Sequence, residues 1–190
     1  MLRWRMTEVA PGLYRSPQPA HRHLKKIKQA GIKTVLNLRG LHPYRGQDEW
    51  RAACAEAGLD YVEVPSLSRG APQAWMIEAL LKAYEDAAFP ALIHCKAGAD
   101  RTGFAAALYQ HYFHDRSIEE AAREQLSLRF GHFKVGKTGV LDFFFETYAA
   151  QAGDLSFDEW WRSYDHEALQ QDFDNSGRGM LRLDLLLRRE

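Results

Sequence analysis

The segment HCKAGADRTG at residues 94–103 combines residue types suited to nucleophilic attack on phosphorus. Cys95 supplies a thiol, and Arg101 can return across a glycine-containing loop to offer two N–H groups to two phosphate oxygens. Backbone N–H groups in such a loop form an anion nest, and a helix beginning near Thr102 adds its positive N-terminal end. The same positive surroundings stabilise a thiolate at Cys95. The pattern therefore predicts a phosphate site, and it disfavours an inert buried thiol.

The other loop residues have expected places around that phosphate. Ala97, Gly98 and Ala99 are expected to present backbone N–H groups to it. Thr102 is expected to donate its hydroxyl to the thiolate when the thiolate becomes the leaving group. Lys96 has two interpretations, which are additional positive charge beside the phosphate or an ordinary solvated lysine.

The segments around this loop alternate between strand and helix patterns. Short apolar runs predict strands at 32–38, 60–64 and 91–95, and residues 7–19 indicate a short strand or hairpin. Apolar residues at helical spacing predict helices at 20–30, 47–57, 77–88 and 101–113. This alternation predicts an α/β domain with a mostly parallel sheet of about four to five strands flanked by helices. The loop after residue 95 would then lie at the carboxyl end of a strand, where ligands gather in such sheets.

After this alternation the pattern is helical only. Ser117 with Glu120, and Ser156 with Glu159, each match a capping box at a helix start. We expect a catalytic domain over residues 1–150 and a C-terminal helical extension over 151–190. Aromatic residues should pack the extension: Phe157, Trp160, Trp161 and Tyr164. The pattern gives no prediction for the last ten residues.

Composition narrows the class of protein. The chain has 190 residues and 46% apolar content, which suits one substantial core. Its 25 basic residues balance 25 acidic ones, so no overall field favours a nucleic acid or a membrane surface. Two cysteines are too few for a disulfide framework, the N-terminus lacks the apolar core of a signal peptide, and no run is long enough to span a membrane. We therefore expect a cytoplasmic protein with reduced thiols, no nucleic-acid partner and no integral membrane segment.

The loop HCKAGADRTG resembles the signature loop of the cysteine-dependent protein tyrosine phosphatases, and within them the dual-specificity branch. Together with GLYRSPQP, GIKTVLNLR and YVEVP, it resembles the bacterial and fungal atypical dual-specificity phosphatases over roughly residues 8–150. The resemblance implies a phosphatase-like fold and two-step hydrolysis without metal or cofactor. Cys95 would form a phosphocysteine, Arg101 would hold the equatorial oxygens, a carboxylic acid would protonate the leaving alcohol, and water would release phosphate. The implied substrates are phosphotyrosine or phosphoserine/threonine proteins, inositol phosphates or phosphoinositides, and the sequence does not choose among them.

The chain departs from that family at the general acid. The usual pattern places an Asp three residues after a proline that resembles Pro65, but Ser68 stands there and Arg69 follows it. Neither side chain is a carboxylic acid. Upstream, Asp60 and Glu63 are interpreted as strand residues facing solvent.

The remaining candidate acid is Asp100, because some bacterial and lipid-directed relatives resemble this chain in carrying Asp there. The adjacent Arg101 favours the ionised carboxylate, whereas a bound phosphate dianion favours the protonated one. Orientation of the arginine or of water is the alternative role for Asp100. A lysine at position 96 resembles the loop of phosphoinositide phosphatases, and Arg39 and Arg69 either extend a basic rim or form structural ion pairs.

Several other patterns do not carry the main prediction. Residues 131–138, GHFKVGKT, match a nucleotide-binding loop, but a helix from Ser117 to about Phe130 precedes them where a buried strand is required. Their glycines are interpreted as helix punctuation, and the resemblance implies that His132 or Lys137 lies near the phosphate site. Cys54 is interpreted as a core residue rather than a disulfide partner of Cys95.

A calcium-like pattern occurs near the C-terminus, beginning at Asp172 and Asp174, but Leu183 occupies the position that requires a glutamate. We interpret this stretch as a solvated turn. Two alternatives to a phosphatase remain: a phosphate-binding module without turnover, suggested by Ser68, and a sulfurtransferase of the rhodanese type. The spacing between Cys95 and Arg101 disfavours the second, because a rhodanese loop is shorter.

Overall fold

The computed structural model describes residues 4–41 and 44–180 of the chain. It contains a five-stranded sheet in the order β1-β2-β5-β3-β4. The strands are β1 Thr7–Ala10, β2 Leu13–Pro17, β3 Thr34–Asn37, β4 Asp60–Glu63 and β5 Ala91–Cys95. β1 pairs antiparallel with β2, as the predicted hairpin requires, and the other neighbours are parallel. The predicted α/β architecture is therefore confirmed, and the carboxyl ends of four strands lie at one edge.

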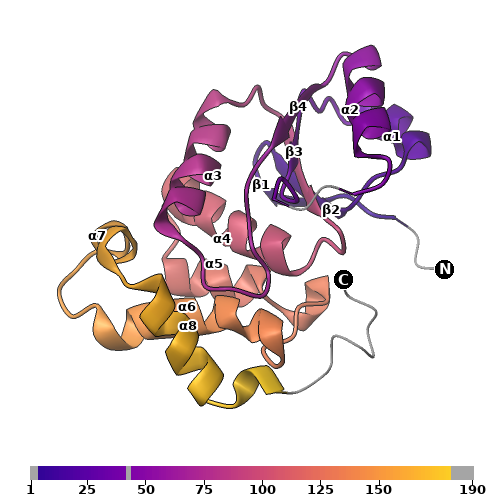
Figure 1. The fold of residues 1–190 in the computed structure, drawn as a ribbon. Coiled ribbons are helices and arrows are strands. Elements are labelled where there is room, and N and C mark those ends of the chain that lie inside the picture. The colour runs from indigo at the N-terminus through magenta and orange to yellow at the C-terminus, as the bar shows by residue number, and fades with distance from the viewer. Residues whose placement is uncertain (1–3, 42–43, 181–190) are drawn as a thin grey trace.

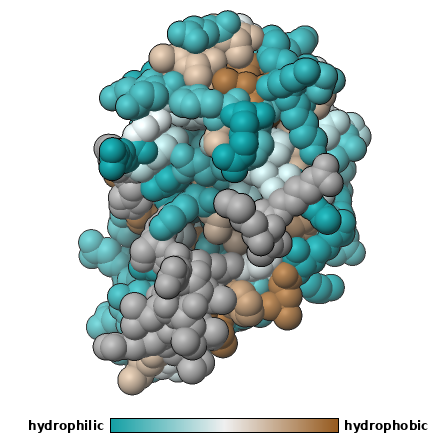
Figure 2. All heavy atoms as spheres, turned by 90° about the vertical axis from the view of Figure 1, so that its right-hand side faces the viewer, coloured by the Kyte–Doolittle hydropathy of each residue, from teal (hydrophilic) through white to brown (hydrophobic). Residues whose placement is uncertain are grey.

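Helices cover both faces of this sheet (Figure 1). The helices are α1 Leu24–Gln29, α2 Gln47–Glu56, α3 Ala74–Asp86, α4 Asp100–His114, α5 Ile118–Gln125, α6 Val140–Gln151, α7 Phe157–Ser163 and α8 His166–Asn175, of which α7 and α8 lie farther from the sheet than the others. Helices α1 and α2 lie on one side, and α3 to α6 lie on the other. Within the described ranges, no helix combines the length and apolar content needed to cross a membrane. The outer face on the side of α1 is mostly hydrophilic (Figure 2).

Several helix boundaries differ from the predictions, and two of them lie next to the candidate site. Helix α4 begins at Asp100, one residue before the predicted range of 101–113, because Gly98 turns the chain at φ +71° and Ala99 serves as the N-cap. An aspartate in the first turn is favoured by the positive end of the helix dipole. Helix α5 ends at Gln125 rather than near Phe130. Ser127 donates its hydroxyl to the Glu124 carbonyl at 2.8 Å, which is a side-chain bond that competes with helix continuation.

Caps at the later helices follow the sequence more closely. The capping box of Ser156 with Glu159 is complete, since each side chain bonds the backbone of the other residue. At Ser117 the serine half is present, with the hydroxyl accepting from the N–H of Glu120 at 3.2 Å. These caps begin α7 and α5 where the pattern predicted helices.

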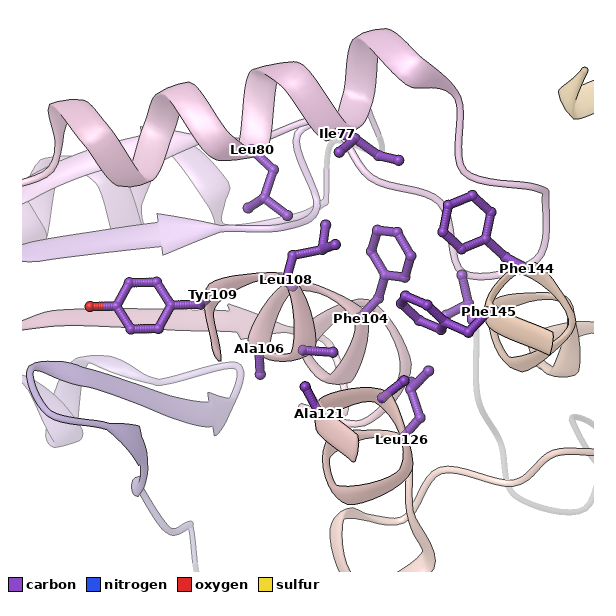
Figure 3. Packing of buried hydrophobic residues seen from close by; sticks show 14 of the residues in the cluster. Ile77, Leu80, Phe104, Ala106, Leu108, Tyr109, Ala121, Leu126, Phe144 and Phe145 are labelled. Atoms are coloured by element: carbon purple, nitrogen blue, oxygen red, sulfur yellow. The ribbon is translucent and has the colours of Figure 1, made fainter. Parts of the chain in front are cut away.

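The sheet separates two apolar clusters because alternate strand residues point to opposite faces. Val35 and Leu92 belong to the cluster beneath α1 and α2, which also contains Cys54 and Trp50. The larger cluster lies on the other face. Figure 3 shows its centre, where α4 runs between α3 and the pair α5 and α6. Its labelled members are Ile77, Leu80, Phe104, Ala106, Leu108, Tyr109, Ala121, Leu126, Phe144 and Phe145.

Residues after position 150 enter this same larger cluster. Phe157, Trp160 and Trp161 are buried, and Trp161 is fully inaccessible. The Trp161 indole donates to the Tyr112 hydroxyl at 2.7 Å, which ties α7 to α4. The aromatic packing expected of the extension is therefore present up to residue 180, while the division at 150 stays a prediction. Residues 181–190, including Leu183, lie outside the described ranges.

Gly103, the last residue of the HCKAGADRTG segment, allows α4 and α5 to pack closely. A Cβ atom at this position would lie 2.7 Å from the carbonyl oxygen of Gln125 and 2.8 Å from Leu126 Cδ2. Only glycine leaves room for this backbone approach. The contact fixes α5 against the first turn of α4, from which Arg101 extends.

Candidate active site

Cys95 ends the buried strand β5 and is 2% exposed. The Gly98 N–H donates to its Sγ atom at 3.2 Å, and the Arg101 side chain also hydrogen-bonds it. Burial lowers the pKa of the Arg101 guanidinium, and the charges of Cys95 and Asp100 partly oppose that effect. Two donors thus converge on the sulfur, as a thiolate nucleophile requires.

The loop carbonyls are held away from the sulfur by residues of β2 and the segment after it. Arg15 Nη2 donates to the carbonyl oxygens of Gly98 at 2.8 Å and Ala99 at 3.3 Å. The Gln18 N–H donates to the Lys96 carbonyl at 3.2 Å. In a trans peptide the N–H points opposite to the C=O. Anchoring these carbonyls favours an inward direction for the N–H groups that follow them, as the predicted nest requires, and the nest itself stays a prediction.

Gly98 is required in this loop for two reasons. Its φ of +71° lies in the left-handed region, which side chains disfavour. A Cβ atom there would also lie 2.6 Å from Pro17 N and 2.7 Å from the Ser16 carbonyl. The loop consequently packs directly on the backbone of β2.

Arg15 is a site residue that the sequence analysis missed. It is 2% exposed, and its Nη1 donates to the backbone and side-chain oxygens of Gln125 at 3.1 and 2.6 Å. Its guanidinium carbon lies 3.7 Å from the centre of the Phe130 ring. Burial lowers the pKa of Arg15 to about 10, which still leaves it charged at neutral pH. The available signal was an arginine inside a predicted strand, because a charge that becomes buried in a sheet needs partners.

A small cavity opens beside Cys95. Its lining residues are Ser68, Arg69, Cys95, Lys96, Ala97, Asp100, Arg101 and Thr138. The usual acid position, Ser68, therefore does reach the site. Asp100 is the one carboxylate among these described lining residues. Asp60 is exposed on β4, whereas Glu63 is partly buried and accepts from Gln47 and Arg51, so the interpretation as solvent-facing residues holds only for Asp60.

Behind the cavity, Asp100 belongs to a buried line of three titratable side chains. Its Oδ1 lies 2.7 Å from His132 Nδ1, and His132 Nε2 lies 2.5 Å from Asp142 Oδ2. His132 is 1% exposed. Burial opposes its charged form, but the hydrogen bonds and charges of the two aspartates outweigh burial and raise the pKa of His132 above 6.5. The residues GHFKVGKT thus contribute a histidine to the site, and Asp142 was not anticipated.

The other predicted residues occupy varied positions. Thr102 is fully buried, and among the described residues its hydroxyl has no hydrogen-bond partner, so its expected donation to the departing thiolate stays a prediction. Ala99 is buried, while Lys96 and Ala97 are exposed. Arg39 donates to Gln18 and stacks on the Tyr44 ring at 4.0 Å.

Lys137 lies outside the Cys95 cavity and lines a neighbouring pocket together with Arg69. In the C-terminal part, the calcium-like residues Asp172 and Asp174 lie in helix α8, so the solvated-turn interpretation is wrong for them. Across the described ranges, no group of three or more histidine, cysteine or acidic side chains is arranged to bind a metal. Both cysteines are free, and Cys54 is buried in the apolar cluster on the other face of the sheet from Cys95, as a core residue should be.

A cysteine and arginine in a glycine-containing loop, between a parallel strand and a helix, define the cysteine-based dual-specificity phosphatase superfamily, and comparisons agree. The family model described as "DSP-PTPase phosphatase fused to NAD+ Kinase" matches residues 3–138. The chain therefore belongs to this family.

A curated relative supports the same placement. The chain is 31% identical over 104 residues to the dual specificity protein phosphatase TpbA of Pseudomonas aeruginosa strain UCBPP-PA14. That match spans 54% of this chain and 44% of the relative, so it covers less than half of the relative's length.

Solved structures share the fold. The crystal structure of P. aeruginosa TpbA has a TM-score of 0.55 and 22% identity, covering 90% of this chain and 91% of that chain. A TpbA variant in complex with phosphotyrosine has a TM-score of 0.54 and 21% identity, covering 90% of each chain. PTPMT1 has a TM-score of 0.52 and 17% identity, covering 80% of this chain and all of that one.

Proposed function

We propose that this chain hydrolyses phosphate monoesters through a phosphocysteine at Cys95, without a metal. The observation that carries the proposal is the loop itself, in which Gly98 N–H and Arg101 converge on the sulfur while Arg15 and Gln18 hold the carbonyls outside. Such a loop offers N–H groups to the equatorial oxygens of a phosphoryl group as charge builds in the transition state.

In the first step the Cys95 thiolate attacks phosphorus, and the bond from phosphorus to the leaving oxygen breaks as that oxygen receives a proton. Arg101 and the loop N–H groups balance the charge on the phosphoryl oxygens. In the second step water attacks the phosphocysteine, the bond from sulfur to phosphorus breaks, and the thiolate is restored. The proton released by that water returns to the group that acted as acid.

That acid is Asp100, with His132 as its proton source. A protonated His132 donates from Nδ1 to Asp100 and from Nε2 to Asp142. When a phosphate dianion occupies the loop, its negative charge favours transfer of the Nδ1 proton to Asp100, without any change in the net charge of the three residues. The arrangement lets Asp100 act as an acid although Arg101 stabilises its ionised form.

The proposed substrates are phosphotyrosine and phosphoserine/threonine proteins, or inositol phosphates and phosphoinositides. The phosphotyrosine complex of the TpbA relative supports the first group. We also propose a cytoplasmic location, with a catalytic domain over residues 1–150 and an extension over 151–190. Two free, buried cysteines are compatible with a reducing compartment.

The direct test is turnover of p-nitrophenyl phosphate by the wild-type chain and by Cys95→Ser, with and without a metal chelator and vanadate. We expect turnover that the chelator leaves unchanged, that vanadate inhibits and that Cys95→Ser abolishes. Acid quenching during turnover should trap phosphate on Cys95, which peptide mass spectrometry detects.

A phosphate-binding module without turnover is the second candidate, favoured by Ser68 at the usual acid position inside the cavity. Under that alternative, wild-type and Cys95→Ser chains would bind a phosphotyrosine peptide equally and neither would release phosphate from it. Absence of turnover on every phosphorylated substrate class would support this alternative.

A further inference from the structure

A groove lies on the outer side of the phosphate loop, and the charged side chains that line it are positive. Its volume is about 830 Å³, within the range of small-molecule sites. It is lined by the N-terminal segment, the end of β2, the turn before α1, loop residues Ala97 and Gly98, and the turn after α5. Four arginines line it, namely Arg5, Arg15, Arg22 and Arg129, and no Asp or Glu occurs among its described lining residues.

Three of these arginines are available to a ligand. Arg15 is buried and uses its N–H groups on loop carbonyls and Gln125, but Arg5, Arg22 and Arg129 are exposed. Within the described ranges no ion pair involves these three. By contrast, four surface arginines elsewhere each contact a carboxylate: Arg51, Arg116, Arg162 and Arg178. In a chain with no net charge, three separate segments therefore bring together in one groove arginines that have no ion-pair partner among the described residues.

The groove adjoins the proposed catalytic cavity. Ala97 lines both, so only a few loop residues separate the groove from Cys95. A phosphate group fits the groove, because guanidinium groups match phosphate oxygens and remain charged at all physiological pH values. A ligand whose first phosphate lies at Cys95 would need to place a second phosphate only on the neighbouring side of the loop.

We propose that this groove is a second anion site, which holds another phosphate of a substrate carrying two or more phosphates on a compact scaffold. The inference rests on the proposed function and narrows its substrate class. A soluble inositol phosphate and a phosphoinositide headgroup present the same chemistry, so they are separate arms of the test.

The test compares turnover of inositol 1-phosphate and inositol 1,4-bisphosphate by the wild-type chain and by the variant Arg5→Ala, Arg22→Ala, Arg129→Ala. Parallel arms use phosphatidylcholine vesicles that contain phosphatidylinositol monophosphate or bisphosphate. The charge-matched control replaces Lys28, Lys33 and Arg123 with alanine; these are exposed and outside the groove.

We expect the triple variant to raise KM for the bisphosphate about tenfold, with a much smaller change for the monophosphate, because exposed ion pairs contribute modestly one by one. The control variant should leave both unchanged. The arm with the larger shift identifies the source of the substrate.

Equal KM shifts for monophosphate and bisphosphate in every arm would overturn the second site. A loss confined to a doubly phosphorylated peptide would replace it with a phosphoprotein site. Turnover of p-nitrophenyl phosphate by the wild-type chain separates these failures from failure of the proposed function, since that substrate has one phosphate and needs only the Cys95 loop.

Discussion

The proton supply to Asp100 gives a prediction that depends on the leaving group. His132 is buried between two aspartates at 2.7 and 2.5 Å, so replacing it with glutamine removes the mobile proton while keeping an amide donor of similar reach. A positioned proton donor accelerates such reactions by about 10²- to 10⁴-fold when the leaving group is poor. We therefore expect His132→Gln to lower kcat/KM, which reports the steps up to departure of the leaving group, about 100-fold for phenyl phosphate at pH 7. The loss for 2,4-dinitrophenyl phosphate, whose leaving group needs no proton, should be less than about threefold.

The pH profile gives an independent measurement. The pKa of His132 is raised above 6.5 by Asp100 and Asp142, and Lys134 lies 3.8 Å from the far oxygen of Asp142. In the wild type, kcat for phenyl phosphate should fall as pH rises through that raised pKa, because the line of three residues then loses its shared proton. The falling limb should be absent in His132→Gln. A stopped-flow or steady-state profile from pH 5 to 9 measures both.

The same group links stability to pH. The folded-state pKa of His132 exceeds its unfolded value, so its contribution to stability is complete below about pH 6.5 and is lost as pH rises through the folded value. The difference in unfolding free energy between the wild type and His132→Gln should shrink over that rise. The control is His111→Gln, since His111 lies near Arg116 and away from the three residues. Equal rate losses on both aryl phosphates, or an unchanged pH profile, would refute the proton-source role.

Three further predictions concern the loop and its support. Arg15→Met should lower kcat for p-nitrophenyl phosphate about 100-fold and the free energy of unfolding by roughly 3 kcal/mol, because buried carbonyls lose a charged donor. Steady-state kinetics measures the first effect and urea unfolding the second. Retained activity would contradict the anchoring role. Gly103→Ala places a Cβ 2.7 Å from a carbonyl oxygen and should lower the free energy of unfolding by about 2 kcal/mol. Calorimetry should then show a Tm that is lower by several degrees, and an unchanged Tm would contradict the close packing. Iodoacetamide at pH 7 should label Cys95 and not Cys54, since burial raises the pKa of Cys54 to about 12. Peptide mass spectrometry identifies the labelled cysteine, and labelling of Cys54 alone would contradict this prediction.

Much of the fold was predictable because its signals are local. The alternation of apolar strands with helices stopped by glycine follows from short-range patterns, and β3, β4, β5 and the intervening helices appear close to their expected places. The boundaries that differ depend on details a pattern does not contain. Ser127 ends α5 through its own side-chain bond, and Gly98 moves the start of α4 to Asp100.

The loop from Cys95 to Arg101 is likewise local. Its residues are consecutive, so their chemistry and approximate geometry follow from the sequence without knowledge of any distant contact. The surroundings of Thr102 are less predictable, because the residue is fully buried and its hydroxyl has no hydrogen-bond partner among the described residues. Side-chain direction within the first turn of a helix is set by packing, which the spacing of residues does not record.

The sequence by itself predicted the candidate nucleophile and phosphate loop, and it determined the α/β architecture and membership of a phosphatase superfamily. Only the tertiary structure decided what surrounds that loop. Arg15 anchors a carbonyl 83 residues away, and His132 meets Asp100 across 32 residues. The three exposed groove arginines come from three segments that are separate in the chain. Such long-range contacts arise when the sheet and helices pack, so the composition of any single segment does not specify them.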